Sequence, residues 1–200
     1  MKVDIQDVLF WMDAIRNSKD QYRTLESFWK GQVNSKIWLI DNLSKIVMPN
    51  ISNKVVIHGG WNGVLASLLF NSTIQINHIT SADIDPVCEK IATTVNKRQE
   101  IEGRFAAITA DMTTYKYDAD IVINTSCEHI TNGAYLRWLD LVPKSALIVV
   151  QSNNYSELEE HINCALDIDD FIKQSKLKVI HSSTLNLPKY DRYMLIGYKQ

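Results

Sequence analysis

The feature that most constrains the fold is a regular alternation of strand-like and helix-like segments from Lys54 to the end of the chain. The strand-like segments are short apolar runs, and the segments between them carry apolar residues at helical spacing. This alternation predicts an α/β fold, a doubly wound and mostly parallel sheet with right-handed crossovers and helices on both faces. The expected strands cover residues 54–59, 75–84, 103–112, 119–126, 145–154, 178–187 and 192–199, and the expected helices cover residues 63–70, 86–101, 133–142 and 156–175.

The first 50 residues have a different pattern, with apolar residues at helical intervals and acidic residues among them. Helices are expected over residues 5–15, 25–29 and 35–47, ending at the proline and asparagines of "MPNISN". We expect residues 1–50 to form an N-terminal helical cap within the same compact unit as residues 51–200. Its aromatic residues either pack on the sheet, which is commoner at helical spacing, or line an acceptor pocket.

Composition describes one ordinary globular domain, with 46% hydrophobic and 22% charged residues in 200. The 21 basic and 23 acidic residues give a net charge of −2. This charge disfavours a protein that coats nucleic acid, but it is compatible with a local basic patch. Three distant cysteines without a CxxC motif argue against a disulfide framework or a structural zinc site. Neither a leader peptide nor a membrane span is indicated, so we expect a soluble, cytoplasmic protein.

The residues that follow the strands carry the candidate chemistry, because ligands of such sheets bind at the carboxyl ends of the strands. The first turn, "HGGWNG", provides Gly59 and Gly63 for a tight reversal that exposes backbone amides. Asp83 ends the second strand twenty positions after Gly63, where an acid can accept hydrogen bonds from ribose hydroxyls. The alternative is an ordinary glycine turn, with Asp83 capping the helix that begins near Pro86.

Three segments together resemble motifs of the class I S-adenosylmethionine-dependent methyltransferases. They are "VVIHGGWNGVLA", "ITSADIDPVCEKIA" and "AITADMTTYKYDADIVINTSCEHI", and the resemblance extends from about Lys54 to the C-terminus. The last two strands fit the terminal antiparallel hairpin that distinguishes this family from nicotinamide-binding Rossmann sheets. The chain is thus similar to a divergent, Rossmann-like member of the family, of the kind that bacteriophages encode.

The resemblance implies an enzyme that binds S-adenosylmethionine through its strand ends. It places Gly59 and Gly63 beside the methionine portion and Asp83 on the ribose. The adenine ring would contact Ile84 after the second strand and Met112 after the third. Its amino group would donate a hydrogen bond to Asp111. The implied cofactor-binding set is His58, Gly59, Gly60, Trp61, Gly63, Asp83, Ile84, Asp111, Met112, Asn124 and Thr125, the last two lining the space between cofactor and acceptor.

Two positions in the first turn depart from the family pattern. Ile57 stands where an acid is common, so the methionyl ammonium needs another acceptor. Trp61 replaces the middle glycine. Its ring either packs in a core, which is commoner for large aromatic side chains, or forms a wall of the cofactor site against the sulfonium.

Glu128 and His129 are the catalytic candidates. A histidine with an ordinary pKa can remove a proton from an attacking hydroxyl or amine. Equally, the pair can fix the loop after the fourth strand. No metal site is expected here, because adjacent residues rarely point together without further ligands. His161 stands alone in the sequence, beside the acidic run "SELEEH", which is expected to be a solvated helix face.

The favoured function is in-line methyl transfer from S-adenosylmethionine to an oxygen or nitrogen of a small-molecule acceptor. Holding the acceptor in line with the methyl group in a dry pocket supplies much of the acceleration, so the absence of a strong catalytic signature does not argue against activity. Methylation of RNA, DNA or protein remains open, as does a non-methylating S-adenosylmethionine binder or enzyme. A nicotinamide oxidoreductase is the remaining alternative.

Overall fold

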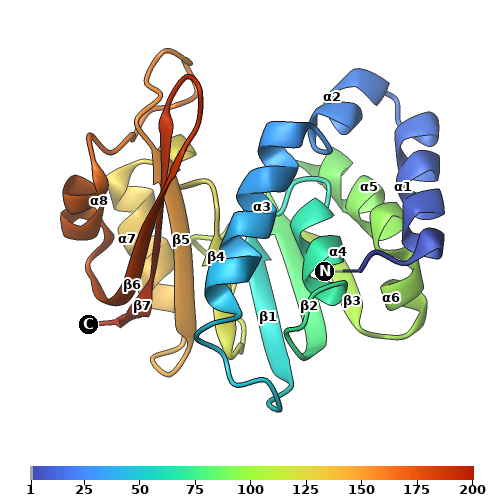
Figure 1. The fold of residues 1–200 in the computed structure, drawn as a ribbon, viewed down its shortest axis with the longest axis horizontal. Helices are drawn as coiled ribbons and strands as arrows, with labels where there is room; N and C mark the ends of the chain where they lie inside the picture. Colours follow the sequence, from blue (N-terminus) through green and yellow to red (C-terminus); the bar gives the residue numbers. More distant parts are fainter. Residues whose placement is uncertain (1) are drawn as a thin grey trace. The chain divides into compact units, whose positions relative to one another are not determined.

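The protein is described by a computed structural model that covers residues 2–200 (Figure 1). Its strands are β1 (Asn53–His58), β2 (Ile76–Asp83), β3 (Phe105–Thr109), β4 (Ile121–Asn124), β5 (Leu147–Asn153), β6 (Leu177–Asn186) and β7 (Asp191–Lys199). They form a seven-stranded sheet in the order β3-β2-β1-β4-β5-β7-β6. The predicted fold class is confirmed: a doubly wound, mostly parallel sheet ends in an antiparallel hairpin and is preceded by N-terminal helices.

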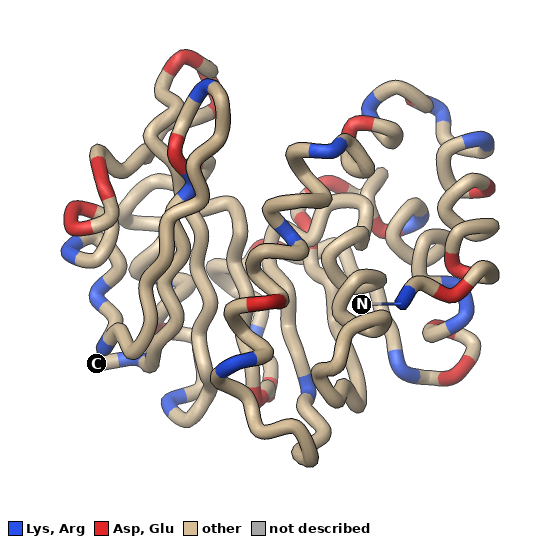
Figure 2. Tube along the Cα trace, viewed as in Figure 1, with Lys and Arg blue, Asp and Glu red and all other residues tan. Residues whose placement is uncertain are grey.

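The helices are α1 (Ile5–Asn17), α2 (Gln21–Glu26), α3 (Lys30–Leu43), α4 (Val64–Phe70), α5 (Pro86–Val95), α6 (Lys97–Ile101), α7 (Asn132–Leu141) and α8 (Ile168–Ser175), with the short 3-10 helix η1 (Cys127–His129). No helix within residues 2–200 is both long and apolar enough to cross a membrane. Acidic and basic residues are interspersed along the trace (Figure 2). The chain divides into two compact units, Met1–Asp111 and Met112–Gln200.

In the first unit, β2 pairs in parallel with both β1 and β3. Strand β1 is almost wholly buried, as expected for a strand covered on both faces. Helix α5 packs on β2 and β3, and α4 packs on β2. The N-terminal helices join these layers, since α1 contacts α5 and α6 while α3 contacts α4.

A buried acid fixes α1 to the rest of this unit. Asp7 is fully buried, and its carboxylate accepts hydrogen bonds from Arg98 Nε at 2.9 Å and Nη2 at 2.8 Å. Asn71 Nδ2 donates a third bond at 2.7 Å. Burial acts to raise the pKa of Asp7, but the hydrogen bonds from Arg98 and Asn71 outweigh it and the pKa lies below its usual value. The acid within the apolar N-terminal pattern is therefore a structural anchor.

In the second unit, β4 pairs in parallel with β5, and β7 runs antiparallel to both β5 and β6. Every residue of β5 is buried. By contrast, β6 alternates buried or half-buried with exposed positions, as expected for an edge strand with one covered face. Helix α8 packs on β6 and β7.

Several expected helices differ from the structure. The helices expected over residues 25–29 and 35–47 correspond to α2 and α3, which begin and end earlier in the sequence. The helix expected over residues 86–101 is divided into α5 and α6 at Asn96, whose side chain donates to the carbonyl oxygens of Gly63 at 3.0 Å and Ala92 at 2.9 Å. The helix expected over residues 156–175 begins only at Ile168, after an N-cap in which Asp167 accepts from Asp170 N at 2.8 Å. Residues 156–167 form turns and irregular backbone, so the acidic run is not a helix face.

Candidate functional site

The turn between β1 and α4, Gly59–Gly63, is called the glycine turn here. Gly59 and Gly63 have φ angles of +62° and +72°, in the left-handed region that favours glycine. A Cβ atom on Gly63 would lie 2.7 Å from Asn96 Nδ2 and 2.9 Å from Ala92 Cβ. The outer glycine predicted from the sequence is therefore required both by its conformation and by the close approach of α5.

Asp83 is held beside the glycine turn by two backbone amides. Its Oδ2 accepts a hydrogen bond from Trp61 N at 2.8 Å, and its Oδ1 accepts one from Asp85 N at 3.0 Å. The carboxylate is half-buried. Because a carboxylate offers about four lone-pair positions, each oxygen can accept a further bond. The N-cap of α5 is Asp85, which accepts from Val87 N at 3.0 Å, so Asp83 is not the helix cap of the alternative interpretation.

Ile84, expected against the adenine, follows Asp83 with 72% of its side chain exposed. An apolar surface thus lies directly after the fixed carboxylate and can cover a planar ring. Asp111, expected to accept from the adenine amino group, is an exposed residue two positions beyond β3. In the first unit the structure therefore brings Asp83 to the glycine turn and leaves Ile84 open to solvent.

Two residues of the implied cofactor-binding set have unusual surroundings: Trp61 has a positive φ, and His58 is buried. Trp61 has a φ of +47°, a conformation that costs a non-glycine residue about 1–2 kcal/mol, and its side chain is half-buried. His58 is fully buried at the end of β1, and burial lowers its pKa to about 4. Its imidazole is therefore neutral at neutral pH.

In the second unit, the predicted residues at the end of β4 bond mainly to their own surroundings. Asn124 is fully buried, with Nδ2 at 3.6 Å from Met112 Sδ and Oδ1 accepting from Ser126 N at 3.0 Å. The carbonyl oxygen of Thr125 accepts from Arg192 Nη2 at 2.7 Å. The structure therefore brings the side chains of Met112 and Asn124 into contact.

Glu128 forms a buried ion pair that the sequence did not reveal. Its Oε1 accepts from Arg192 Nη1 at 3.1 Å and from Asn153 Nδ2 at 2.8 Å, and the side chain is only 3% exposed. Arg192 also donates to Gln151 Oε1 at 3.2 Å. The available signals were one basic residue in the apolar run of β7 and the polar end of β5. The paired carboxylate fixes η1 against β5 and β7, in line with the interpretation that the Glu-His pair orders this loop.

His129 follows with an exposed side chain. Its ring lies 4.7 Å from that of His161, with the ring planes 79° apart. The sequence predicts a helix face for the segment that contains His161. The structure places it in the irregular segment after β5 and brings it to the predicted catalytic pair.

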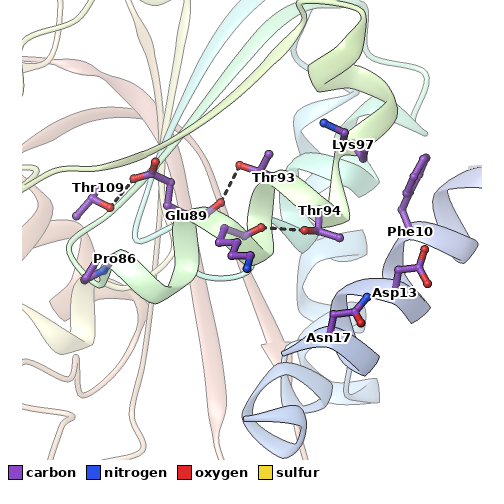
Figure 3. Close-up of a pocket in the computed structure, with 10 residues that line it drawn as sticks. Phe10, Asp13, Asn17, Pro86, Glu89, Thr93, Thr94, Lys97 and Thr109 are labelled. Carbon is purple, nitrogen blue, oxygen red and sulfur yellow. Dashed lines mark hydrogen bonds between the residues drawn. The ribbon is translucent and has the colours of Figure 1, made fainter. Parts of the chain in front are cut away.

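A hollow in the first unit lies between α1 and the helices α5 and α6 (Figure 3). Its volume is about 530 Å³. At its rim Thr109 donates to Glu89 Oε2 at 2.6 Å, and Phe10 approaches from α1. Within the described residues, no member of the predicted cofactor set lines this hollow.

No protein-family model matches the sequence, and no curated protein sequence matches it. Solved structures do match, and they show that the chain has the fold of class I S-adenosylmethionine-dependent methyltransferases. Magnesium protoporphyrin IX methyltransferase from Synechocystis, with bound S-adenosylmethionine, is similar over 96% of this chain and 91% of its own, with a TM-score of 0.66 and 13% identity.

Two further solved structures are similar to this chain. The protein MtNAS, in complex with MTA and tNA, matches 97% of this chain and 70% of its own, with a TM-score of 0.64 and 15% identity. Mitomycin 7-O-methyltransferase matches 94% of this chain and 60% of its own, with a TM-score of 0.62 and 14% identity. The comparisons say nothing about a bacteriophage origin.

Proposed function

We propose that the protein is an S-adenosylmethionine-dependent methyltransferase that transfers a methyl group in line to an oxygen or nitrogen of a small-molecule acceptor. The observation that carries the proposal is the Asp83 carboxylate, fixed by Trp61 N and Asp85 N beside the glycine turn. Its remaining lone pairs suit the two hydroxyls of a ribose, and Ile84 supplies an exposed apolar surface next to it. The methyltransferase fold makes S-adenosylmethionine the matching ribose-bearing cofactor.

The proposed cofactor site comprises the glycine turn with His58, Asp83 with Ile84, and the residues at the ends of β3 and β4. In this proposal Asp111 and Met112 hold the adenine, and Asn124 and Thr125 border the acceptor. Because the sulfonium is already a good leaving group, the main task of the chain is to hold the acceptor in line and exclude water.

Of the two proposed catalytic residues, His129 is the better proton acceptor. Glu128 is buried, and its Oε1 is already engaged by Arg192 and Asn153. His129 is exposed, and a carbonyl oxygen, that of Glu160, lies 3.1 Å from its Nδ1. Nδ1 must donate in that bond, so Nε2 retains the lone pair that a base needs. We assign proton removal to His129 and orientation of its loop to Glu128.

We further propose that residues 1–50 act as a helical cap that selects an apolar or aromatic acceptor. Tyr22 and Trp29 support this role, since they are 74% and 64% exposed. The matched methyltransferases are named for a magnesium protoporphyrin and for mitomycin, which are small molecules. Free thiols at Cys88, Cys127 and Cys164 fit a reducing, cytoplasmic location.

The test is calorimetric titration of the purified protein with S-adenosylmethionine, S-adenosylhomocysteine and NAD. We expect both adenosyl ligands to bind and NAD not to bind. Binding of NAD alone would overturn the proposal in favour of an oxidoreductase. A label-transfer assay from methyl-labelled S-adenosylmethionine then separates the acceptor classes: label on ring-containing small molecules supports the proposal, whereas label only on RNA, DNA or protein moves it to a macromolecular methyltransferase. Tight cofactor binding without transfer to any of these classes would indicate a non-methylating binder.

A further inference from the structure

We propose that Glu128, His129 and His161 form a binding site for a divalent transition-metal ion, best suited to zinc. Each residue offers one ligand atom, and the three atoms lie within 4.8 Å of one another. In a tetrahedral zinc site with bonds of about 2.0–2.2 Å, ligand atoms lie roughly 3.3–3.6 Å apart. Small side-chain adjustments would bring the three atoms of this cluster to that spacing. Two histidines and one carboxylate are an established ligand set for zinc and for non-haem iron.

The carboxylate is oriented for such a role. Both hydrogen bonds to the Glu128 carboxylate, from Asn153 and Arg192, end on Oε1. Its Oε2 is buried and, among residues 2–200, has no hydrogen-bond partner. Leaving a buried polar atom without a partner is unfavourable, and a bound cation would offset that cost. Glu128 is therefore held by one oxygen and leaves the other for a ligand.

Both imidazole rings are fixed through their Nδ1 atoms. His161 Nδ1 lies 2.6 Å from the carbonyl oxygen of Tyr155, and His129 Nδ1 lies 3.1 Å from that of Glu160. A carbonyl oxygen only accepts, so Nδ1 carries the proton in each ring and Nε2 carries the lone pair. Metal-binding histidines are commonly oriented by this kind of bond, which fixes the tautomer and raises the basicity of the ligating nitrogen.

Backbone contacts bring His161 to the cluster before any metal binds. Asn163 N donates to the carbonyl oxygen of Glu128 at 3.0 Å, and Asn163 Nδ2 donates to that of Cys127 at 3.5 Å. Ala165 N donates to the carbonyl oxygen of Asn153 at 3.0 Å. These hydrogen bonds hold the segment after β5 against η1 and β5, close to His161. Less conformational entropy is therefore lost when an ion binds.

The surrounding charges favour zinc over magnesium. Arg192 offsets the charge of Glu128, so imidazole nitrogens make up most of the ligand set. Zinc binds imidazole well, whereas magnesium prefers carboxylate, carbonyl and water oxygens. The exposed acids Glu157, Glu159 and Glu160 lie on the segment that carries His161 and attract cations to it. Acidic residues of this segment after β5 are red in Figure 2.

The site does not rest on the proposed methyl transfer, because all its ligands and contacts lie within residues 112–200. It does compete with one part of that proposal. An ion on His129 Nε2 occupies the lone pair that proton removal needs, so the metal-loaded form cannot use His129 as a base. Three protein ligands leave a coordination position for water or another ligand.

The test is zinc titration of the chelator-treated, full-length protein by calorimetry, with bound metal counted by plasma mass spectrometry after dialysis. We expect one zinc ion per chain, a rise in the melting temperature, and no displacement by equimolar magnesium. His161→Ala and Glu128→Gln should each weaken zinc binding about tenfold or more. His181→Ala, which removes a histidine of β6 outside the cluster, is the matched control and should bind as the parent does.

The proposal fails if the parent protein binds no stoichiometric zinc, or if His161→Ala binds as tightly as the parent. Glu128→Gln leaves Arg192 buried without its partner and can unfold the unit, so circular dichroism must first confirm its fold. His161→Gln, at a half-buried position, supplies a second variant that preserves the ion pair. Cobalt substitution checks the ligand type: a thiolate charge-transfer band would assign the ion to a cysteine and overturn the ligand set.

Discussion

The backbone amide of Trp61 donates a 2.8 Å hydrogen bond to Asp83 Oδ2, which joins the turn after β1 to the end of β2. This contact links the one residue that breaks the glycine pattern to the acid expected to bind the ribose. Trp61 also has a positive φ of 47°. A glycine would adopt this backbone conformation more easily than the tryptophan does.

Trp61→Gly and Trp61→Ala should differ in stability. Both variants remove the indole ring, but only glycine relieves the left-handed backbone, so the glycine variant should be more stable by about 1 kcal/mol. Urea unfolding of the two proteins measures the difference. Equal stabilities would show that the turn relaxes when the ring is removed.

If the ring also forms a wall of the cofactor site, both variants should bind S-adenosylmethionine more weakly than the parent, and unchanged affinity would exclude that role.

Asp83→Ala should raise the dissociation constant for S-adenosylmethionine about 10- to 100-fold, because it removes a charged acceptor of ribose hydrogen bonds. Asp83→Asn keeps one acceptor oxygen and should lose less. Asp41→Ala, an exposed acid on α3, serves as the control and should leave calorimetric affinity unchanged. An Asp83→Ala protein that folds and binds normally would move the ribose site elsewhere.

Asp7→Asn should lower the free energy of unfolding by about 3 kcal/mol, since it leaves Arg98 without its buried partner. Asp13→Asn, on the exposed face of the same helix, should change it by less than about 0.5 kcal/mol. The pKa of Asp7 is lowered in the folded state, so its contribution is complete above the unfolded value near 4 and is lost as the pH falls through the folded pKa. Denaturation curves from pH 5 to pH 3 should fall less steeply for Asp7→Asn than for the parent.

His58 should make the free energy of unfolding depend on pH between about pH 7 and pH 5, above the range set by Asp7. Its folded pKa of about 4 lies below its ordinary value of 6.5, so the unfolded chain takes up the proton first. Stability due to the neutral ring is complete above about pH 6.5 and should fall by about 2 kcal/mol between pH 7 and pH 5. His58→Gln should lack this part of the fall, whereas His78, whose pKa burial also lowers, contributes to both proteins. Parallel pH profiles for parent and variant would contradict the assignment.

Local patterns predicted the fold well because its elements are encoded in short stretches. The β-branched run before Gly59 and the periodic apolar residues after Gly63 specify strand, turn and helix from adjacent positions. The acidic run before Ile168 was predicted wrongly as helix. There the N-cap at Asp167 and the contacts of Asn163 with η1 outweigh local helix propensity.

The sequence by itself determined the order of strands and helices, the glycine turn and the position of Asp83 at a strand end, because each depends on neighbours within a few positions or on a fixed spacing. Only the tertiary structure decided the partners of Glu128. Arg192 lies 64 positions away and His161 lies in another loop, and no periodicity connects them to Glu128. Folding places these side chains together through the pairing of β5 with β7 and the docking of the segment after β5, so the chemistry of Glu128 and His129 is set by contacts that the linear sequence does not display.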